Sequence, residues 1–503
     1  MTVRATSDLR NRWAVPRASI PDVGPEEFRR ALLTAIGAGG RFVAYFGMPE
    51  EAQHVRIYAV VEDELARLAA ISTRVLDRFP SLTPDCSSAS RFECEIAEQC
   101  GVEPAGHPAL KPVRRHPPDH LPSGRAAPAG FDRNAYPFER IESHDVHEVG
   151  VGPVHAGIIE PGHFRFRAYG EEVLDLEIML GYQHRGVERL LETLPPRRGV
   201  LVAESIAGDT VIGHAEAYCA AYEALGRARK SPRAQAIRGV ALELERLANH
   251  LGDLGAMAGD VAFQPAAAFL GQLRGDCLNL LMMLSGNRYG RGLVRPGGVL
   301  FDVPEPMADE IHRRLEALAE GLRPVLDLLF EHAMVQGRFE GVGVVPQAWC
   351  QSLGLVGPVA RACAVARDVR HDHPFGIFRF AHLPIATAWA GDVLARALVR
   401  RLEAQRSLDF LLERVRSLPR GEPRVPCEAL RPDELVVALT EGWRGEIAHV
   451  VVTGRDGQVA RHKVIDPSFH NWPALGAAMA GNQISDFPLC NKSFNLSYAG
   501  HDL

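Results

Sequence analysis

Apolar and polar positions repeat with a helical period along much of the chain after residue 200. From 235 to 261, apolar side chains recur every three or four positions, which places them on one face of a single long helix. Such a face must be buried against other helices. The same spacing predicts further helices at 212–229, 266–285, 306–333 and 388–417.

Shorter segments of the same region favour β-structure. They lie at 150–178, 297–303 and 447–464. In the last of them, Asp456 and Gly457 separate two strand-like runs, and this dipeptide is typical of a tight hairpin turn. These segments predict β-hairpins at the periphery of a mainly helical domain.

The first 110 residues show a different pattern, which predicts a small α/β domain. Helical spacing predicts helices at 28–33 and 62–76, and apolar runs predict strands at 42–45 and 55–61. The fold class is therefore α+β, with the α/β domain followed by the mainly helical one.

Residues 111–145 separate these two parts. They are rich in proline, glycine and arginine and lack periodicity, which indicates a linker or an extended strap. We thus predict an N-terminal domain at 1–110, a linker at 111–145 and a large domain at 146–503.

Composition excludes several classes of protein. A net charge of −6 argues against a nucleic-acid partner, which would favour a basic face. No apolar run approaches the roughly 20 residues that span a bilayer, and the first residues lack the apolar stretch of a secretory signal. We expect a cytoplasmic chain that partner subunits hold at the membrane. The nine cysteines form no C-x-x-C pair, which fits free thiols in a reducing compartment.

Several segments, taken in order, carry a family resemblance to the two catalytic-arm subunits of respiratory complex I, fused in one chain. The segment at 79–115, with Glu93, Glu95 and the sequence Gly106-His107-Pro108, is similar to the end of one of them. The rest resembles the other one and the large subunits of membrane-bound nickel–iron hydrogenases of the formate hydrogenlyase type. That second resemblance rests on GPVHAGIIEPGHFRF (152–166), LGYQHRGVERLLE (180–192), ELERLANHLGDLGAMAGD (243–260), SGNRYGRGLVRPGGV (285–299), GLVGPVARA (354–362) and DPSFHNW (466–472).

The resemblance also identifies what is missing. In the hydrogenases two C-x-x-C pairs supply thiolates to nickel and iron, one pair before a histidine and one after Asp-Pro. With His214 as the anchor, Ala207 and Thr210 stand at the first pair, and Ser468 and Asn471 stand at the second. Methyl, hydroxyl and amide groups cannot replace thiolates. We therefore expect no metal, no bound cofactor and no hydrogenase chemistry in this chain, and we expect the residues after Asn471 to stay and pack.

Complex I lost the same cysteines and binds a quinone headgroup in that region. By motif position, the resemblance implies that His155 and Tyr218 hydrogen-bond a quinone and that Asp260 orients the histidine. His214 and Glu216 are expected to line the former metal cavity. The alternatives are that Tyr218 is a core residue and that His155 and Asp260 pair for structural reasons only.

The LGYQHRGVE segment lies where the family faces its iron–sulfur subunit. His184, Arg185 and Glu188 are therefore expected at an interface with an iron–sulfur small subunit of the kind found in complex I, which would carry the iron–sulfur clusters. The alternative for Glu188 is a solvated helix face with local ion pairs.

Two functional hypotheses follow. In the first, the chain is a subunit of an oxidoreductase related to NADH:quinone oxidoreductase and hydrogenase. It is active only within a complex, docks on antiporter-like membrane subunits at the inner face of the cell membrane, and couples electron transfer to ion movement. In the second, it is a non-catalytic subunit that only assembles the complex.

Overall fold

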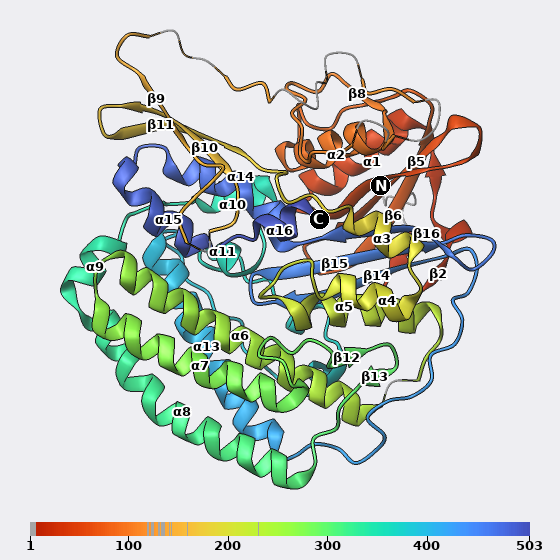
Figure 1. The fold of residues 1–503 in the computed structure, drawn as a ribbon. Helices are drawn as coiled ribbons and strands as arrows, with labels where there is room; N and C mark the ends of the chain where they lie inside the picture. Colours follow the sequence, from red (N-terminus) through yellow and green to blue (C-terminus); the bar gives the residue numbers. More distant parts are fainter. Residues whose placement is uncertain are drawn as a thin grey trace.

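The computed structural model describes residues 7–117, 120–121, 125–128, 131, 136–139, 141, 143–157, 159–229 and 231–503, apart from the side chain of residue 52. An N-terminal α/β part lies on one side of a central sheet, and a bundle of long helices lies on the other (Figure 1). The α+β class predicted from the sequence is confirmed.

The N-terminal part is a sheet with strand order β1-β6-β5-β4, and β3 pairs with β6 in parallel. Helix α1 (Pro25–Gly37) packs on β6, and α2 (Ser90–Cys100) packs on β4. The strands are β1 (Ser7–Leu9), β3 (Asp22–Val23), β4 (Arg41–Pro49), β5 (Val55–Glu62) and β6 (Leu68–Val75), and the short parallel pair β7 (Arg78–Pro80) and β8 (Glu103–Ala105) follows.

The helix predicted at 62–76 is wrong. After a turn at Asp63–Arg67, residues Leu68–Val75 form β6, which pairs with β5 along its whole length. The alanines gave this segment apparent helical spacing. Its second half carries Ile71, Thr73 and Val75 at alternate positions, and such β-branched residues favour a pleated sheet.

Residues between the two parts include a small outer sheet. Its strands are β9 (His147–Val151), β10 (His163–Tyr169) and β11 (Glu172–Met179), in the order β11-β10-β9. It projects from the upper left of Figure 1, as expected of a peripheral hairpin. The described residues of the predicted linker form no regular element between β8 and β9.

The helical bundle confirms the predicted long helices. Helix α6 (Pro232–Asp260) begins where the Ser231 hydroxyl accepts a hydrogen bond from the Ala234 amide, and it packs on α7 and α13 along its apolar face. The others are α5 (Val211–Leu225), α7 (Gln264–Ser285), α8 (Glu305–Glu331) and α13 (Val393–Val415).

The central sheet has the strand order β16-β15-β14-β2. Strands β14 (Glu434–Gly442) and β15 (Gly445–Thr453) are buried along their whole length, so this hairpin is not peripheral as predicted. Strand β16 (Val459–Ile465) forms its outer edge, and the predicted turn at Asp456-Gly457 joins it to β15. Strand β2 (Val15–Pro16) comes from the N-terminal part, so the two parts share this sheet.

Short elements complete the fold around this sheet. They are α3 (Val187–Thr193), α4 (Pro196–Ala203), β12 (Val294–Arg295), β13 (Gly298–Val299), α9 (Ala333–Phe339), α10 (Gln347–Leu353), α11 (Gly357–Arg361), α12 (Val369–Asp372), α14 (Pro467–Met479), α15 (Phe487–Phe494) and α16 (Tyr498–Asp502).

Two glycines meet where α11 crosses the β14–β15 turn. Gly357 has a φ of +68°, and a Cβ atom there would lie 2.1 Å from the Arg444 carbonyl oxygen. Gly445, with a φ of +130°, would place its own Cβ 2.7 Å from the Gly357 Cα. Only glycine allows this approach.

We therefore expect Gly357→Ala to lower the free energy of unfolding by at least about 3 kcal/mol, because it combines a left-handed backbone with a backbone clash. Gly271→Ala is the matched control, since its Cβ would meet nothing within 4 Å and it lies inside α7. That change should stabilise the chain by about 0.5–1 kcal/mol. Urea unfolding measures both, and equal effects would contradict the prediction.

Candidate functional site

The four positions that would carry metal-binding thiolates are buried and occupied by other interactions. Ala207 and Thr210 precede α5, whereas Ser468 and Asn471 lie in the first turns of α14, and none is more than 1% exposed. The Thr210 hydroxyl accepts hydrogen bonds from Trp443 Nε1 and Arg444 Nη1, each at 3.1 Å.

The second pair of positions is bound to backbone. The Asn471 side chain accepts from the Val356 amide and donates to the Val356 carbonyl, both at 3.0 Å. Ser468 Oγ accepts from the Ser497 amide at 2.8 Å. Residues after Asn471 pack as expected, with α15 and α16 partly or wholly buried.

An arginine–aspartate pair lies beside these positions. Arg444 donates to both carboxylate oxygens of Asp209, at 2.5 and 2.8 Å, and its Nε donates to the Asn495 carbonyl. Although burial lowers it, the Asp209 charge raises the pKa of Arg444. These donors do not fit a nickel–iron centre. Within the described ranges, no group of three His, Cys, Asp or Glu side chains is arranged to hold a metal ion.

Three buried histidines extend from this region. His214 Nε2 lies 3.0 Å from Asp466 Oδ2, and His214 Nδ1 lies 3.3 Å from His449 Nε2. His449 Nδ1 lies 2.9 Å from Nε2 of His462. All three side chains are fully buried, and the Tyr218 ring stacks on the His462 ring with centroids 5.6 Å apart.

The sequence analysis missed His449 and His462. They lie diagonally on one face of the β15–β16 hairpin, where His449 pairs with Val464 and His462 with Val451. The predicted hairpin turn could have placed them together, because its register follows from the turn at Asp456-Gly457.

The residues proposed for a quinone pocket do not meet in this structure. His155 lies in the loop between β9 and β10, where its Nε2 is 2.8 Å from the Gly162 carbonyl oxygen. Tyr218 is buried in α5 and donates to the Pro196 carbonyl at 3.1 Å. Asp260 is exposed at the end of α6 near Lys492, and partial burial raises its pKa. Among the described contacts, no hydrogen bond or ion pair joins any two of the three.

His214 and Glu216 point in different directions from α5. His214 faces Asp466 and the central sheet, as expected for the former metal cavity. Glu216 instead forms ion pairs with Arg12 at 2.6 Å and Arg238 at 3.2 Å. The prediction that Glu216 shares a cavity with His214 is not supported by these contacts.

His184, Arg185 and Glu188 line a cleft of about 680 Å³. His184 packs edge-on against His116, and burial together with His116 and Arg114 lowers the pKa of His184 to about 4. Arg185 donates to the backbone carbonyls of residues 205, 206 and 499. Their place at a partner interface stays a prediction.

Glu188 is 6% exposed, which excludes the solvated helix face considered for it. It accepts hydrogen bonds from Lys463 Nζ and Arg461 Nη2, both at 2.8 Å. Although burial raises it, the charges of Arg461 and Lys463 hold the pKa of Glu188 well below its ordinary value.

Lys463 also joins the two parts of the chain. Its ammonium lies 2.5 Å from Glu95 on α2 and is fully buried, and Glu95 pairs in turn with Arg114. A second link runs from Arg41 on β4 to Glu446 on β15. Buried charges of this kind must be paired, so these contacts fix how the N-terminal part sits on the central sheet.

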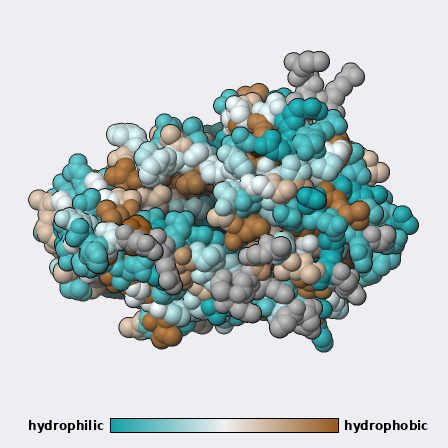
Figure 2. All heavy atoms as spheres, turned by 90° about the horizontal axis from the view of Figure 1, so that it is seen from above, coloured by the Kyte–Doolittle hydropathy of each residue, from teal (hydrophilic) through white to brown (hydrophobic). Residues whose placement is uncertain are grey.

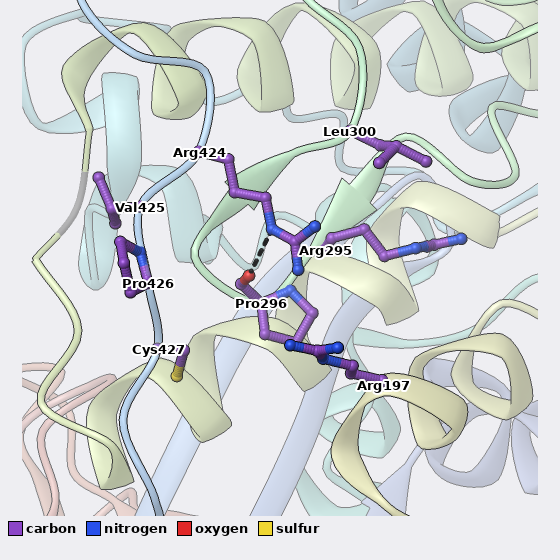
Figure 3. A pocket seen from close by; sticks show the side chains of 8 residues that line it. All are labelled: Arg197, Arg295, Pro296, Leu300, Arg424, Val425, Pro426 and Cys427. Atoms are coloured by element: carbon purple, nitrogen blue, oxygen red, sulfur yellow. Dashed lines mark hydrogen bonds between the residues drawn. The ribbon is translucent and has the colours of Figure 1, made fainter.

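A second cavity of about 680 Å³ lies between α4 and the segment that precedes β14 (Figure 3). Its lining is basic, with Arg197, Arg295 and Arg424 on its walls. Arg295 pairs with Glu204 at 2.5 Å, and Arg424 Nε donates to the Pro296 carbonyl at 3.3 Å.

The outer surface offers no spanning segment. Among the described residues, no helix combines the length and the apolar character needed to cross a bilayer. On the face seen in Figure 2, hydrophobic residues are interspersed with hydrophilic ones.

Comparisons with known proteins place this fold. The family "Respiratory-chain NADH dehydrogenase, 49 Kd subunit" matches residues 260–502. Carbon monoxide-induced hydrogenase of Rhodospirillum rubrum is 31% identical over 348 residues, which cover 69% of this chain and 96% of that protein. Formate hydrogenlyase subunit 5 of Escherichia coli K12 is 28% identical, with 92% of this chain and 85% of that protein covered.

A solved archaeal complex agrees with these relatives. A chain of the membrane-bound sulfane sulfur reductase, described as an archaeal respiratory membrane complex, superposes with a TM-score of 0.68 at 25% identity. The match covers 72% of this chain and all of that one. Fold and sequence together define a large subunit of the complex I and hydrogenase class. The chain belongs to the family of respiratory-chain 49 Kd subunits and membrane-bound hydrogenase large subunits.

Removing the buried ammonium should be costly. Lys463→Met leaves Glu95 and Glu188 with one partner fewer, and we expect the free energy of unfolding to fall by about 3–5 kcal/mol. The exposed Arg189 supplies the control, because Arg189→Met should change it by less than about 0.5 kcal/mol. Adding Glu95→Gln to Lys463→Met should recover part of the loss. Urea unfolding with no effect of Lys463→Met would refute the role of this lysine.

Stability should also fall in mild acid. Burial lowers the pKa of His462 and of His470 to about 3 and, with neighbouring charges, that of His184 to about 4. The unfolded chain binds protons on these histidines below their ordinary pKa of about 6.5, whereas the folded chain does not. The stabilisation is complete above pH 6.5 and is lost as the pH falls toward 4.

At pH 5 each of these histidines should cost about 2 kcal/mol relative to pH 7.5. His470→Gln should therefore reduce the pH dependence of urea unfolding by that amount. His371→Gln, at an exposed position, should leave it unchanged. An unaltered pH dependence in His470→Gln would show that this assignment is wrong.

Proposed function

We propose that the chain is a subunit of a membrane-associated oxidoreductase related to complex I and to formate hydrogenlyase, and that it neither forms nor splits hydrogen. The observation that carries this proposal is the state of the four ligand positions. An alanine methyl, two bound hydroxyls and an amide paired with Val356 occupy the places of the thiolates. Relatives named as membrane-bound hydrogenase and F(420)H(2) dehydrogenase subunits support the kind of complex.

In this proposal the chain couples electron transfer in its partners to ion movement. An iron–sulfur small subunit would dock at the cleft that carries His184 and Arg185, because cationic and imidazole side chains gather there. Antiporter-like membrane subunits would hold the assembly at the inner face of the cell membrane.

A quinone is the electron acceptor that this proposal names. A relative from Dehalococcoides mccartyi, named as a subunit of NADH-quinone oxidoreductase, is 30% identical and is covered over 93% of its length. His155, in the β9–β10 loop, is the residue of this chain best suited to reach such a ligand. It is only partly buried and needs to give up a single contact with a carbonyl group. Tyr218 is enclosed and its hydroxyl is already bound.

The test is the binding of a quinone analogue to the assembled complex. We expect His155→Ala to weaken binding about tenfold, the equivalent of one hydrogen bond of about 1.4 kcal/mol. Tyr218→Phe should change it less than about twofold. His147→Ala, at an exposed position on β9, is the control.

Unchanged binding in His155→Ala would exclude the quinone site and favour the second candidate, a subunit that only assembles the complex. Stoichiometric nickel in the purified complex would contradict the proposal as a whole, provided that the metal resides in this subunit.

A further inference from the structure

The histidine chain has a defined hydrogen-bond direction. The Asp466 carboxylate can only accept, so His214 carries its proton on Nε2. His214 Nδ1 then accepts from His449 Nε2–H, and His449 Nδ1 accepts from His462 Nε2–H. This pattern is satisfied when all three rings are neutral.

One atom at the end of the chain has no partner. Nδ1 of His462 is buried and forms no hydrogen bond with any group in the described part of the protein. In the pattern above it carries a lone pair, so it can accept a proton. A buried polar atom left without a partner costs free energy, which calls for a functional explanation.

We propose that His462, His449 and His214 form a proton relay between the cleft under α3 and the former metal position. A proton binds to Nδ1 of His462, and that ring passes its Nε2 proton to Nδ1 of His449. His449 in turn passes its Nε2 proton to Nδ1 of His214. The positive charge ends on His214, beside the Asp466 carboxylate, and no electrons move.

The outer end of the relay lies at the wall of the cleft. The His462 amide donates to Glu192 Oε1 at 3.2 Å, and both Glu192 and the adjacent Arg461 line the cleft. Glu188, the nearest buried carboxylate, is already paired with Lys463 and Arg461. A proton therefore has no stronger acceptor at this end than Nδ1 of His462.

Neighbouring tyrosines enclose the chain without joining it. The rings of Tyr218 and Tyr222 lie 5.6 and 5.9 Å from the His462 ring. Their hydroxyls donate to the carbonyls of Pro196 and Leu191 instead. They exclude water, which confines the proton to the imidazoles.

The inner end lies where the family binds its metals. Asp466 accepts from the Ser468 amide with its other oxygen, at 2.8 Å, and the Arg444–Asp209 pair lies nearby. Burial lowers the pKa of His449 and of His462, which keeps these two rings neutral at rest. The charge is stable only at His214, next to a carboxylate, so the relay runs inward.

This inference rests on the proposed coupling function but not on a quinone. The test uses the assembled complex with ¹⁵N-labelled histidine, reduced by dithionite. Infrared difference spectra report imidazolium, and a pH-indicator dye reports proton uptake. In the wild type we expect both signals to appear together.

His449→Gln keeps hydrogen-bonding groups but cannot carry the charge. We expect it to slow proton uptake at least tenfold and to abolish the imidazolium signal. His449→Ala should behave likewise and regain uptake when free imidazole is added, which a purely structural role would not allow. His371→Gln, at an exposed position, is the matched control.

If His449→Gln does not assemble, His462→Gln is tested with the same expectation. Uptake at the wild-type rate in either assembled variant would overturn the relay and leave the proposed function intact. Absence of uptake in the wild-type complex would overturn the coupling function itself.

Discussion

A single buried ammonium group sets the geometry on which the rest of the site depends. Lys463 lies between Glu95 of the N-terminal part and Glu188 of α3, and a charge so far from water is tolerable only with both partners in place. Because side chains alternate along β16, a lysine that faces Glu95 turns His462 and Val464 toward α5. The position of the histidine chain thus follows from the pairing of this lysine.

The region that holds metal in the hydrogenases is held together here by hydrogen bonds. Metal–thiolate bonds would join the segment before α5 to the start of α14. In this protein Thr210 binds Trp443 and Arg444, and Asn471 binds the Val356 backbone. The same segments remain joined, and the fold of the family is kept.

Much of the fold could be predicted from the sequence, and the reason differs between elements. The apolar stripe of α6 runs through 29 residues, so its period is unambiguous. Strand β6 was mistaken for a helix because alanines fit either period, and only pairing with β5 decides. For the site, motif positions located the replaced ligands and His214. They could not show that Tyr218 and His155 face different surroundings, because the direction of a side chain depends on tertiary packing.

The double hydrogen bond between Asn471 and Val356 has an evolutionary consequence. Cysteine at this position could form neither bond, and cysteine in place of Ser468 would weaken the one that holds Ser497. Each reversion alone would therefore destabilise the chain before any metal could compensate. The exchange works as a ratchet: a lineage that has taken these substitutions does not return to hydrogen chemistry one mutation at a time.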